Sequence, residues 1–236
     1  VFHLAGQPGV LYSFKNPKSY QKNNTEATKT LCEVCLKYNV EKFIFGSSSS
    51  VYGKQKKFPI KETSKLNPQN PYAISKLNSE KILKKIFKKK KNYIIFRFFT
   101  VYGPHGRPDM FIHKFLNAIK NKKPLKLHNS GLNYRDFTYI DDVVKILIKS
   151  INKKLKYKLY NICRSSPILT NELVEIIKNK FKKKKIRLIK TPFVKGEMLK
   201  THGCNKKLKS EYKKLNFTNI KIGLNKTINQ FKKTST

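Results

Sequence analysis

Two stretches decide the fold: KFIFGSS at Lys42–Ser48 and NPYAISK at Asn70–Lys76. The first is an apolar run that ends in small hydroxyl residues, which predicts a buried parallel strand whose carboxyl end opens into a loop. In the second, Asn70 followed by Pro71 is typical of a helix N-cap and a first helical position. The sequence therefore predicts a strand, and later a helix that begins near Tyr72.

This strand and helix belong to a longer alternating pattern. We expect strands at 1–5, 42–48 and 93–98, with helices near 23–38 and 71–88 between them. This βαβ order predicts a parallel sheet. Beyond residue 103 the alternation of strands and helices becomes less regular. There we expect helices near 110–121, 141–151, 170–181 and 222–231, and strands around 125–128, 157–162 and 186–190.

Tyr72 and Lys76 are one helical turn apart and therefore share a face of the predicted helix. A phenol has an ordinary pKa of about 10, and a neighbouring ammonium lowers the pKa of the tyrosine toward the range that a general base needs. Ser48 ends the preceding strand, where ligands bind in open α/β sheets, and could orient the same substrate hydroxyl. The alternative is an exposed Tyr–Lys pair, which a lysine-rich chain produces by chance.

The chain of 236 residues has a formal net charge of +40, which by itself would indicate a nucleic-acid partner. We weigh against that interpretation because nearly all of the 53 basic residues are lysines, whereas base readout and bidentate phosphate contacts favour arginine. Cys32 and Cys35 have C-x-x-C spacing without a second pair, so we expect buried thiols and no metal. Without an evident leader or long apolar stretch, we expect a cytoplasmic protein with no membrane contact.

Taken together, the motifs resemble those of the extended short-chain dehydrogenase/reductases in the NAD-dependent epimerase/dehydratase family, which act on nucleotide sugars. The resemblance covers roughly residues 1–205 and rests on five stretches in the family's order: FHLAG at 2–6, SSSSVYG at 47–53, YAISK at 72–76, RFFTVYGP at 97–104 and RDFTYIDD at 135–142. A longer run, TVYGPHGRPDM at 100–110, is most similar to the UDP-glucuronate 4-epimerase branch.

The resemblance implies a Rossmann-like, doubly wound parallel sheet with a smaller α/β substrate domain. Residues 1–100 would be the later part of the NAD-binding domain, 134–151 would return to it, and 101–236 would form the interleaved nucleotide-sugar domain. None of the ten glycines makes the glycine-rich turn with which this fold binds pyrophosphate. We therefore expect that the first strands and that turn, roughly 70 to 80 residues of a full enzyme, lie outside the chain.

The implied activity is NAD-dependent 4-epimerisation, interconverting UDP-glucuronate and UDP-galacturonate by transient oxidation at C4. Tyr72, Lys76 and Ser48 would be catalytic. The residues implied to contact the cofactor are Leu4, Ala5, Gly6, Asn24, Tyr72, Lys76 and Phe99. Those implied to contact the UDP-sugar are Ser49, Ser50, Thr100, Arg107, His128, Arg135 and Glu197. Alternatively, Asn24 is a helix N-cap, and Arg107 and Arg135 form surface ion pairs.

Ser49 and Ser50 separate this chain from related enzymes. Sugar-nucleotide 4,6-dehydratases carry an Asp–Glu pair at these positions, and UDP-glucuronate decarboxylases carry a glutamate at the second, because their reactions need an added acid or base. Epimerisation needs neither, so the serines favour it. Two departures from the branch pattern, Leu11 in place of arginine and Cys204 in place of aspartate, keep UDP-glucose and UDP-N-acetylhexosamines open as substrates.

Other functions stay open at this point. Within the superfamily, the chain could be a UDP-glucose 4-epimerase or an enzyme of the dTDP-glucose 4,6-dehydratase type. From a different class, it could be a basic polyanion-binding remnant of an enzyme, or an inactive fragment. The family implies a homodimer without a nucleic-acid partner.

Overall fold

The computed structural model describes residues 1–88, 92–181, 186–194 and 196–234, and the chain forms two compact units. The first unit comprises 1–99, 150–162 and 203–214; the second comprises 100–149, 163–202 and 215–236. The expected domains, 1–100 with a return at 134–151 and an interleaved 101–236, stay a prediction. The segments that return to the first compact unit are 150–162 and 203–214. The first of these returns because it carries a strand of the first unit's sheet.

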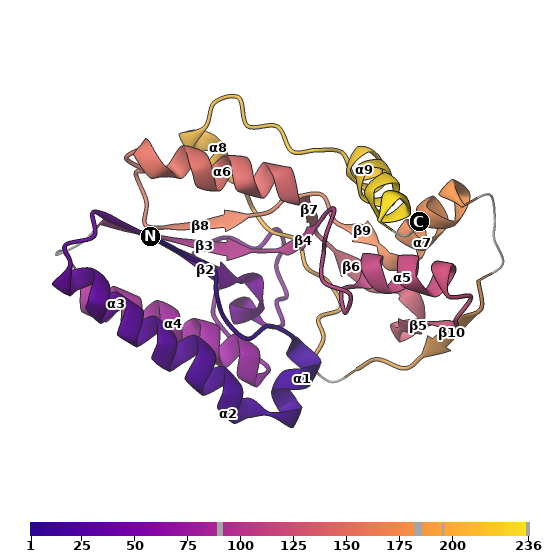
Figure 1. Cartoon of the computed structure of the whole chain (residues 1–236), viewed down its shortest axis with the longest axis horizontal. Helices are drawn as coiled ribbons and strands as arrows, with labels where there is room; N and C mark the ends of the chain where they lie inside the picture. Colours follow the sequence, from indigo (N-terminus) through magenta and orange to yellow (C-terminus); the bar gives the residue numbers. More distant parts are fainter. Residues whose placement is uncertain (89–91, 182–185, 195, 235–236) are drawn as a thin grey trace. The chain divides into compact units, whose positions relative to one another are not determined.

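That sheet has four parallel strands in the order β1–β2–β3–β8. Their bounds are β1 Phe2–His3, β2 Lys42–Ser48, β3 Asn92–Phe98 and β8 Leu159–Ile162. The central strands are almost entirely buried, as expected for a parallel sheet covered on both faces. Because the strands are parallel, the carboxyl ends of β1, β2 and β3 meet at one edge (Figure 1). The predicted Rossmann-like α/β sheet is confirmed.

Helices α3 (Ala27–Lys37) and α4 (Pro71–Phe87) lie side by side against one face of this sheet (Figure 1). The core between helices and strands consists of Cys32, Cys35, Phe43, Phe45, Leu83, Phe87, Tyr93 and Ile95. The thiols are buried as expected, and burial raises the pKa of Cys32 to about 12. Asn70 caps α4 as predicted: its Oδ1 accepts from the Ala73 amide at 2.9 Å, and Pro71 is the first helical residue.

Five short helices complete the first unit: α1 (Val10–Lys15), α2 (Pro17–Tyr20), the π-helix η1 (Gln21–Glu26), the 3₁₀-helix η2 (Ser49–Tyr52) and α8 (Lys206–Glu211). The helix expected near 23–38 is therefore η1 continued by α3. We did not predict α1, α2, η2 or α8, because helices of four to six residues carry too little periodicity to be recognised.

The second unit combines helices with three strand pairs, of which β4–β7 and β5–β10 are parallel and β6–β9 is antiparallel. Its strands are β4 Thr100–Tyr102, β5 Leu125–His128, β6 Tyr134–Arg135, β7 Phe137–Tyr139, β9 Ile168–Leu169 and β10 Leu188–Thr191. Its helices are α5 Phe111–Lys120, η3 Asn129–Gly131, α6 Ile140–Asn152 (whose last residues belong to the first unit), α7 Thr170–Lys180 and α9 Ile220–Lys233. The fully buried residues Phe115, Leu116, Leu173, Ile177 and Leu224 centre its core on α5, α7 and α9.

The four longer helices and β5 and β10 of this unit were predicted, whereas the two- and three-residue strands were not. Within the described part of the chain, no helix combines the length and the apolar character needed to cross a bilayer.

Candidate active site

Tyr72 lies in the first turn of α4, directly after the capping residue and the proline that start the helix. Its side chain is half-buried, and its ring meets the edge of the Tyr20 ring with 6.1 Å between centroids. Tyr20 is itself fixed, because its hydroxyl donates to the Pro8 and Gly9 carbonyls at 2.7 Å. Tyr72 is thus held on one side by a rigid aromatic neighbour and keeps part of its surface accessible.

Lys76 lies one turn further along α4 and is 7% exposed. Its Nζ donates to the Gly46 carbonyl of β2 at 2.8 Å and lies 4.9 Å from the centroid of the Phe45 ring. Burial lowers the pKa of Lys76 to about 8, while the carboxylate of Glu80 acts in the opposite direction. The fold therefore holds an ammonium that titrates close to neutral pH at a fixed place above β2.

Ser48 ends β2 and caps η2, and it is 8% exposed. Its Oγ accepts from the Ser50 amide at 3.2 Å and donates to the Ser50 Oγ at 3.1 Å. The hydroxyl proton of Ser48 is therefore directed at a side chain that a substrate oxygen could replace. Ser49 and Ser50 are half-buried at the start of η2, and both η2 and β2 contact α4.

Asn24 is not a helix N-cap, which corrects one of the two interpretations of this residue. It lies inside η1, where the helix has already begun, and is 2% exposed. Its Oδ1 accepts from the Gln7 amide at 2.6 Å, and its Nδ2 donates to the Gln7 carbonyl at 3.0 Å and to the Ser75 Oγ at 2.9 Å. Asn24 therefore ties the segment after β1 to α4, beside Lys76.

Leu4, Ala5 and Gly6 follow β1 and are exposed. A Cβ added to Gly6 would lie 2.6 Å from the Asn24 Oδ1 and 3.7 Å from the Lys76 Nζ. Gly6 therefore lets the exposed backbone after β1 pass close to the Asn24 amide and the Lys76 ammonium, where a larger side chain would clash with Asn24. This donor set fits the ribose and nicotinamide end of NAD.

Phe99 is 4% exposed, and its ring lies 6.4 Å from that of Tyr52, so the ring belongs to the core of the first unit. Its contact with a cofactor stays a prediction. The described residues contain no cluster of three or more His, Cys, Asp or Glu side chains placed to bind a metal.

The second unit carries the other predicted substrate residues. Thr100 and Arg107 line one cavity, together with apolar residues that include Tyr102, Met110 and Phe137. Arg107 is exposed and forms a two-pronged ion pair with Asp109: its Nε donates to Oδ1 at 2.9 Å, and its Nη2 contacts Oδ2. The guanidinium lowers the pKa of Asp109 through that hydrogen bond. Arg107 thus forms the surface ion pair that we held as its alternative.

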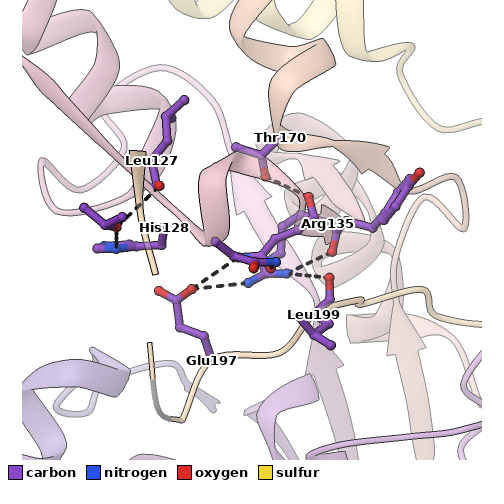
Figure 2. A network of polar contacts seen from close by, with 10 residues as sticks. Leu127, His128, Arg135, Thr170, Glu197 and Leu199 are labelled. Carbon is purple, nitrogen blue, oxygen red and sulfur yellow. Dashed lines mark hydrogen bonds and ion pairs between the residues drawn. The ribbon is translucent and has the colours of Figure 1, made fainter. Parts of the chain in front are cut away.

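Arg135 and Glu197 lie together, although 61 residues separate them in the chain (Figure 2). The Arg135 Nη2 lies 3.7 Å from the Glu197 Oε2, and the Arg135 Nη1 donates to the Tyr134 carbonyl at 3.0 Å. Burial lowers the pKa of Arg135, whereas Glu197 raises it. Asn133 donates to the same Glu197 oxygen at 3.4 Å, so the carboxylate is held from two sides.

His128 ends β5, and its Nδ1 lies 3.1 Å from the Thr191 Oγ1 across the β5–β10 pair (Figure 2). Thr191 also donates its single hydroxyl proton to the Leu127 carbonyl at 3.4 Å. These two contacts link the His128 ring to the backbone of β5 through Thr191. The ring of His128 is therefore oriented by its neighbours and is half-buried.

Several residues around these groups were missed from sequence, among them Ser75, Glu80, Asp109, Asn133 and Thr191. Two of them carried a local signal: Glu80 lies one turn beyond Lys76, and Asp109 lies two residues beyond Arg107. The others act through contacts between distant segments, which no local pattern reveals.

Comparisons with known proteins identify the family of the chain. Residues 1–163 match the family model described as the NAD dependent epimerase/dehydratase family. The chain is 38% identical over 188 residues to a UDP-glucuronate 4-epimerase of Thermodesulfobacterium geofontis, covering 78% of this chain and 57% of that protein. The chain therefore belongs to the NAD dependent epimerase/dehydratase family.

Solved structures support the same family assignment. MoeE5 in complex with UDP-glucose and NAD superposes with a TM-score of 0.93 at 29% identity, covering 100% of this chain and 80% of that one. The UDP-glucuronic acid 4-epimerase from Bacillus cereus, in complex with UDP-glucuronic acid and NAD, gives a TM-score of 0.91 at 29% identity, covering 98% and 74%. The chain spans 62%, 61% and 49% of the lengths of three further curated relatives.

Proposed function

We propose that the protein is an NAD-dependent nucleotide-sugar 4-epimerase that interconverts UDP-glucuronate and UDP-galacturonate. The observation that carries the proposal is the arrangement at the start of α4. A partly accessible Tyr72 precedes, by one turn, an ammonium that the Gly46 carbonyl holds in place, close to the exposed backbone of Gly6. This combination suits proton abstraction from a sugar hydroxyl beside a nicotinamide ring.

In the proposed reaction, Tyr72 Oη takes the proton from the sugar 4-hydroxyl and later returns it. Lys76, as a cation, stabilises the phenolate and makes the tyrosine a usable base at neutral pH. The Ser48 hydroxyl turns from Ser50 to the sugar oxygen and orients it. Gly6, Asn24 and Lys76 would hold the ribose and nicotinamide end of NAD. When bound, NAD would supply the hydride acceptor and donor that oxidation and re-reduction at C4 require.

The proposed substrate class is supported by the names of the relatives and by the types of residue predicted to contact the substrate. Ser49 and Ser50 offer hydroxyls to a uronate carboxylate and no carboxylic acid for dehydration. Arg107 and Arg135 would bind the diphosphate, since guanidinium groups bind phosphate through paired donors. For this, each arginine must exchange a carboxylate, Asp109 or Glu197, for phosphate oxygens. Glu197 and His128 would then meet the uridine ribose and base.

Two further proposals concern the protein as a whole. We propose that it acts as a cytoplasmic homodimer, and the exposed apolar residues Val34 on α3 and Ile74 on α4 support a helical interface. Size-exclusion chromatography with light scattering tests the dimer, and Ile74→Glu should shift the protein toward the monomer. An unchanged mass would contradict this interface.

The function itself is tested by incubating the purified protein with NAD and UDP-glucuronate and identifying the product by NMR. We expect UDP-galacturonate. A UDP-pentose would assign the protein to the decarboxylases instead. A 4-keto-6-deoxy product from a nucleotide hexose would assign it to the dehydratases.

A further inference from the structure

Glu80 is a fully buried carboxylate on α4, one turn beyond Lys76 and two turns beyond Tyr72. Its Oε1 accepts from the Arg97 Nε at 2.8 Å and from the Ser47 Oγ at 2.5 Å, and its Oε2 accepts from the Arg97 Nη2 at 2.6 Å. Arg97 is 1% exposed. These short contacts all join α4 to strands of the sheet, Ser47 in β2 and Arg97 in β3.

Stability alone does not account for such a pair. Taking two charges out of water costs several kcal/mol per ion, and well-packed apolar residues of similar volume are often as stable. Charged hydrogen bonds differ from apolar contacts in fixing distance and direction. What Glu80 and Arg97 add is therefore a defined position of α4 along β2.

That position matters because of which residues it aligns. Tyr72, Lys76 and Glu80 follow one another at intervals of four along the same face of α4. Lys76 bonds to the backbone of Gly46 in β2, and Glu80 bonds to the next residue, Ser47. The residue after that is Ser48. Two consecutive contacts thus fix the helix that carries the base to the strand that ends in the orienting serine.

We propose that Glu80 is a positioning residue for the reaction: clamped by Arg97 and Ser47, it holds Tyr72 and Lys76 in register with Ser48 and keeps the Lys76 ammonium charged. This inference rests on the proposed function of that site. It adds a requirement for a carboxylate that touches neither substrate nor cofactor.

The charges around Lys76 support the second half of the proposal. From β1, His3 faces Lys76, and burial lowers the pKa of that imidazole to about 4, so His3 is neutral at pH 7. From β3, Arg97 is paired with Glu80. On α4 itself the ionisable neighbours are Tyr72 and Glu80, and Glu80 raises the pKa of Lys76 against the effect of burial. Loss of the Glu80 charge would therefore favour a neutral Lys76.

Glu80→Gln tests the proposal. We expect kcat to fall ~10- to 100-fold with KM nearly unchanged, because a misplaced base slows the chemical step more than binding. We expect the pKa of Lys76, followed by ¹⁵N-lysine NMR and assigned with Lys76→Arg, to fall by about one unit. The alkaline limit of activity should move to lower pH with it. A Lys76 titration like that of the wild type would overturn the proposal.

Glu62→Gln is the matched control, because Glu62 is also a buried acid of the first unit. It is 7% exposed, and its Oε1 accepts from the Asn161 amide at 3.0 Å, with no hydrogen bond to α4 among the described residues. It should leave the Lys76 titration unchanged. If Glu62→Gln lowered the pKa of Lys76 equally, the effect would reflect a general loosening of the first unit. That result would contradict a specific role for Glu80.

If Glu80→Gln does not fold, the double variant Glu80→Met with Arg97→Met replaces the pair by apolar side chains, which is often neutral for stability. The same fall in kcat is then expected, with a smaller fall in the Lys76 pKa, because the positive charge of Arg97 is removed together with the negative charge of Glu80. If neither variant folds, the Glu80–Arg97 pair is required for folding itself, and this result would overturn the positioning role. The proposed function fails separately, if the wild type itself makes no 4-epimer from UDP-sugars.

Discussion

The cations of the two compact units are held in different ways. In the first unit, Lys76 is buried and bonds to a backbone carbonyl, and its position follows from the helix and strand that carry it. In the second unit, Arg107 and Arg135 pair with nearby carboxylates, Asp109 and Glu197. In the proposed mechanism, the catalytic cation is thus built into the fold. The two cations proposed to bind the diphosphate are held in ion pairs that would have to open for the substrate.

The largest effect is expected in the first unit, from Tyr72→Phe. Removing one oxygen deletes the proposed base, and we expect kcat to fall about 10³-fold, within the usual range for general base catalysis. The fold should survive, because the side chain is half-buried and the ring is retained. Steady-state kinetics and circular dichroism check both points. Tyr38→Phe, at a ring that is 70% exposed, is the control and should leave kcat unchanged. Retention of most activity in Tyr72→Phe would exclude the tyrosine as base.

A second prediction concerns the pH dependence that Lys76 imposes. The pKa of Lys76 is lowered to about 8, so the ammonium loses its proton as pH rises through 8, and kcat should fall there. In Lys76→Arg the guanidinium stays charged over the accessible pH range, which should remove this limit even if kcat is lower. Lys76→Met should lower kcat roughly 10- to 100-fold at pH 7. A pH profile in Lys76→Arg that still falls at pH 8 would assign the limit to another group.

A smaller effect is expected from the exchangeable ion pairs of the second unit. Arg135→Gln should raise KM for the UDP-sugar about tenfold and change kcat little, because the charge contributes to binding in both ground and transition states. Glu197→Gln releases Arg135 from its partner but removes a proposed ribose contact, so its effect on KM should be smaller. Arg187→Gln, at an exposed arginine outside the predicted site, is the control. A change in kcat without a change in KM would instead indicate that Arg135 acts in the chemical step.

The smallest effect on catalysis, but a measurable one on stability, is expected at His3. This imidazole is buried, lies 2.9 Å from the Thr28 Oγ1 and has its pKa lowered to about 4. As pH falls from 6.5 to 4, the unfolded chain binds a proton that the folded chain does not, so the free energy of unfolding decreases by at most about 3 kcal/mol. Urea titrations should show this loss, and His3→Gln should flatten it. His105→Asn, at an exposed histidine, should not.

The sequence predicted elements best where the signal is local. Asn70 and Pro71 start α4 as expected, and the apolar run of β2 ends at Ser48. The position of Tyr72 and Lys76 on one helix therefore needed no tertiary information. The short helices α1 and α2 and the two- and three-residue strands of the second unit were missed, because they depend on their neighbours and carry no period of their own. The strand β1, also two residues long, was predicted within 1–5.

The environment of the site residues was less predictable than their positions. Asn24 contacts Ser75, which is 51 residues away, and Glu197 contacts Asn133, which is 64 residues away. A motif indicates the residue type and leaves such partners unspecified. Burial likewise decides that the pKa of Lys76 is low, and burial is a property of the packed unit.

The most direct test of the central claim, transient oxidation at C4 with Tyr72 moving the proton, uses UDP-glucuronate carrying deuterium at C4. Because the hydride leaves C4 and returns to the same carbon, we predict that the UDP-galacturonate formed in ordinary water keeps the deuterium at C4. Loss of the label to solvent would show that a proton, rather than a hydride, is removed from that carbon, and it would contradict the account.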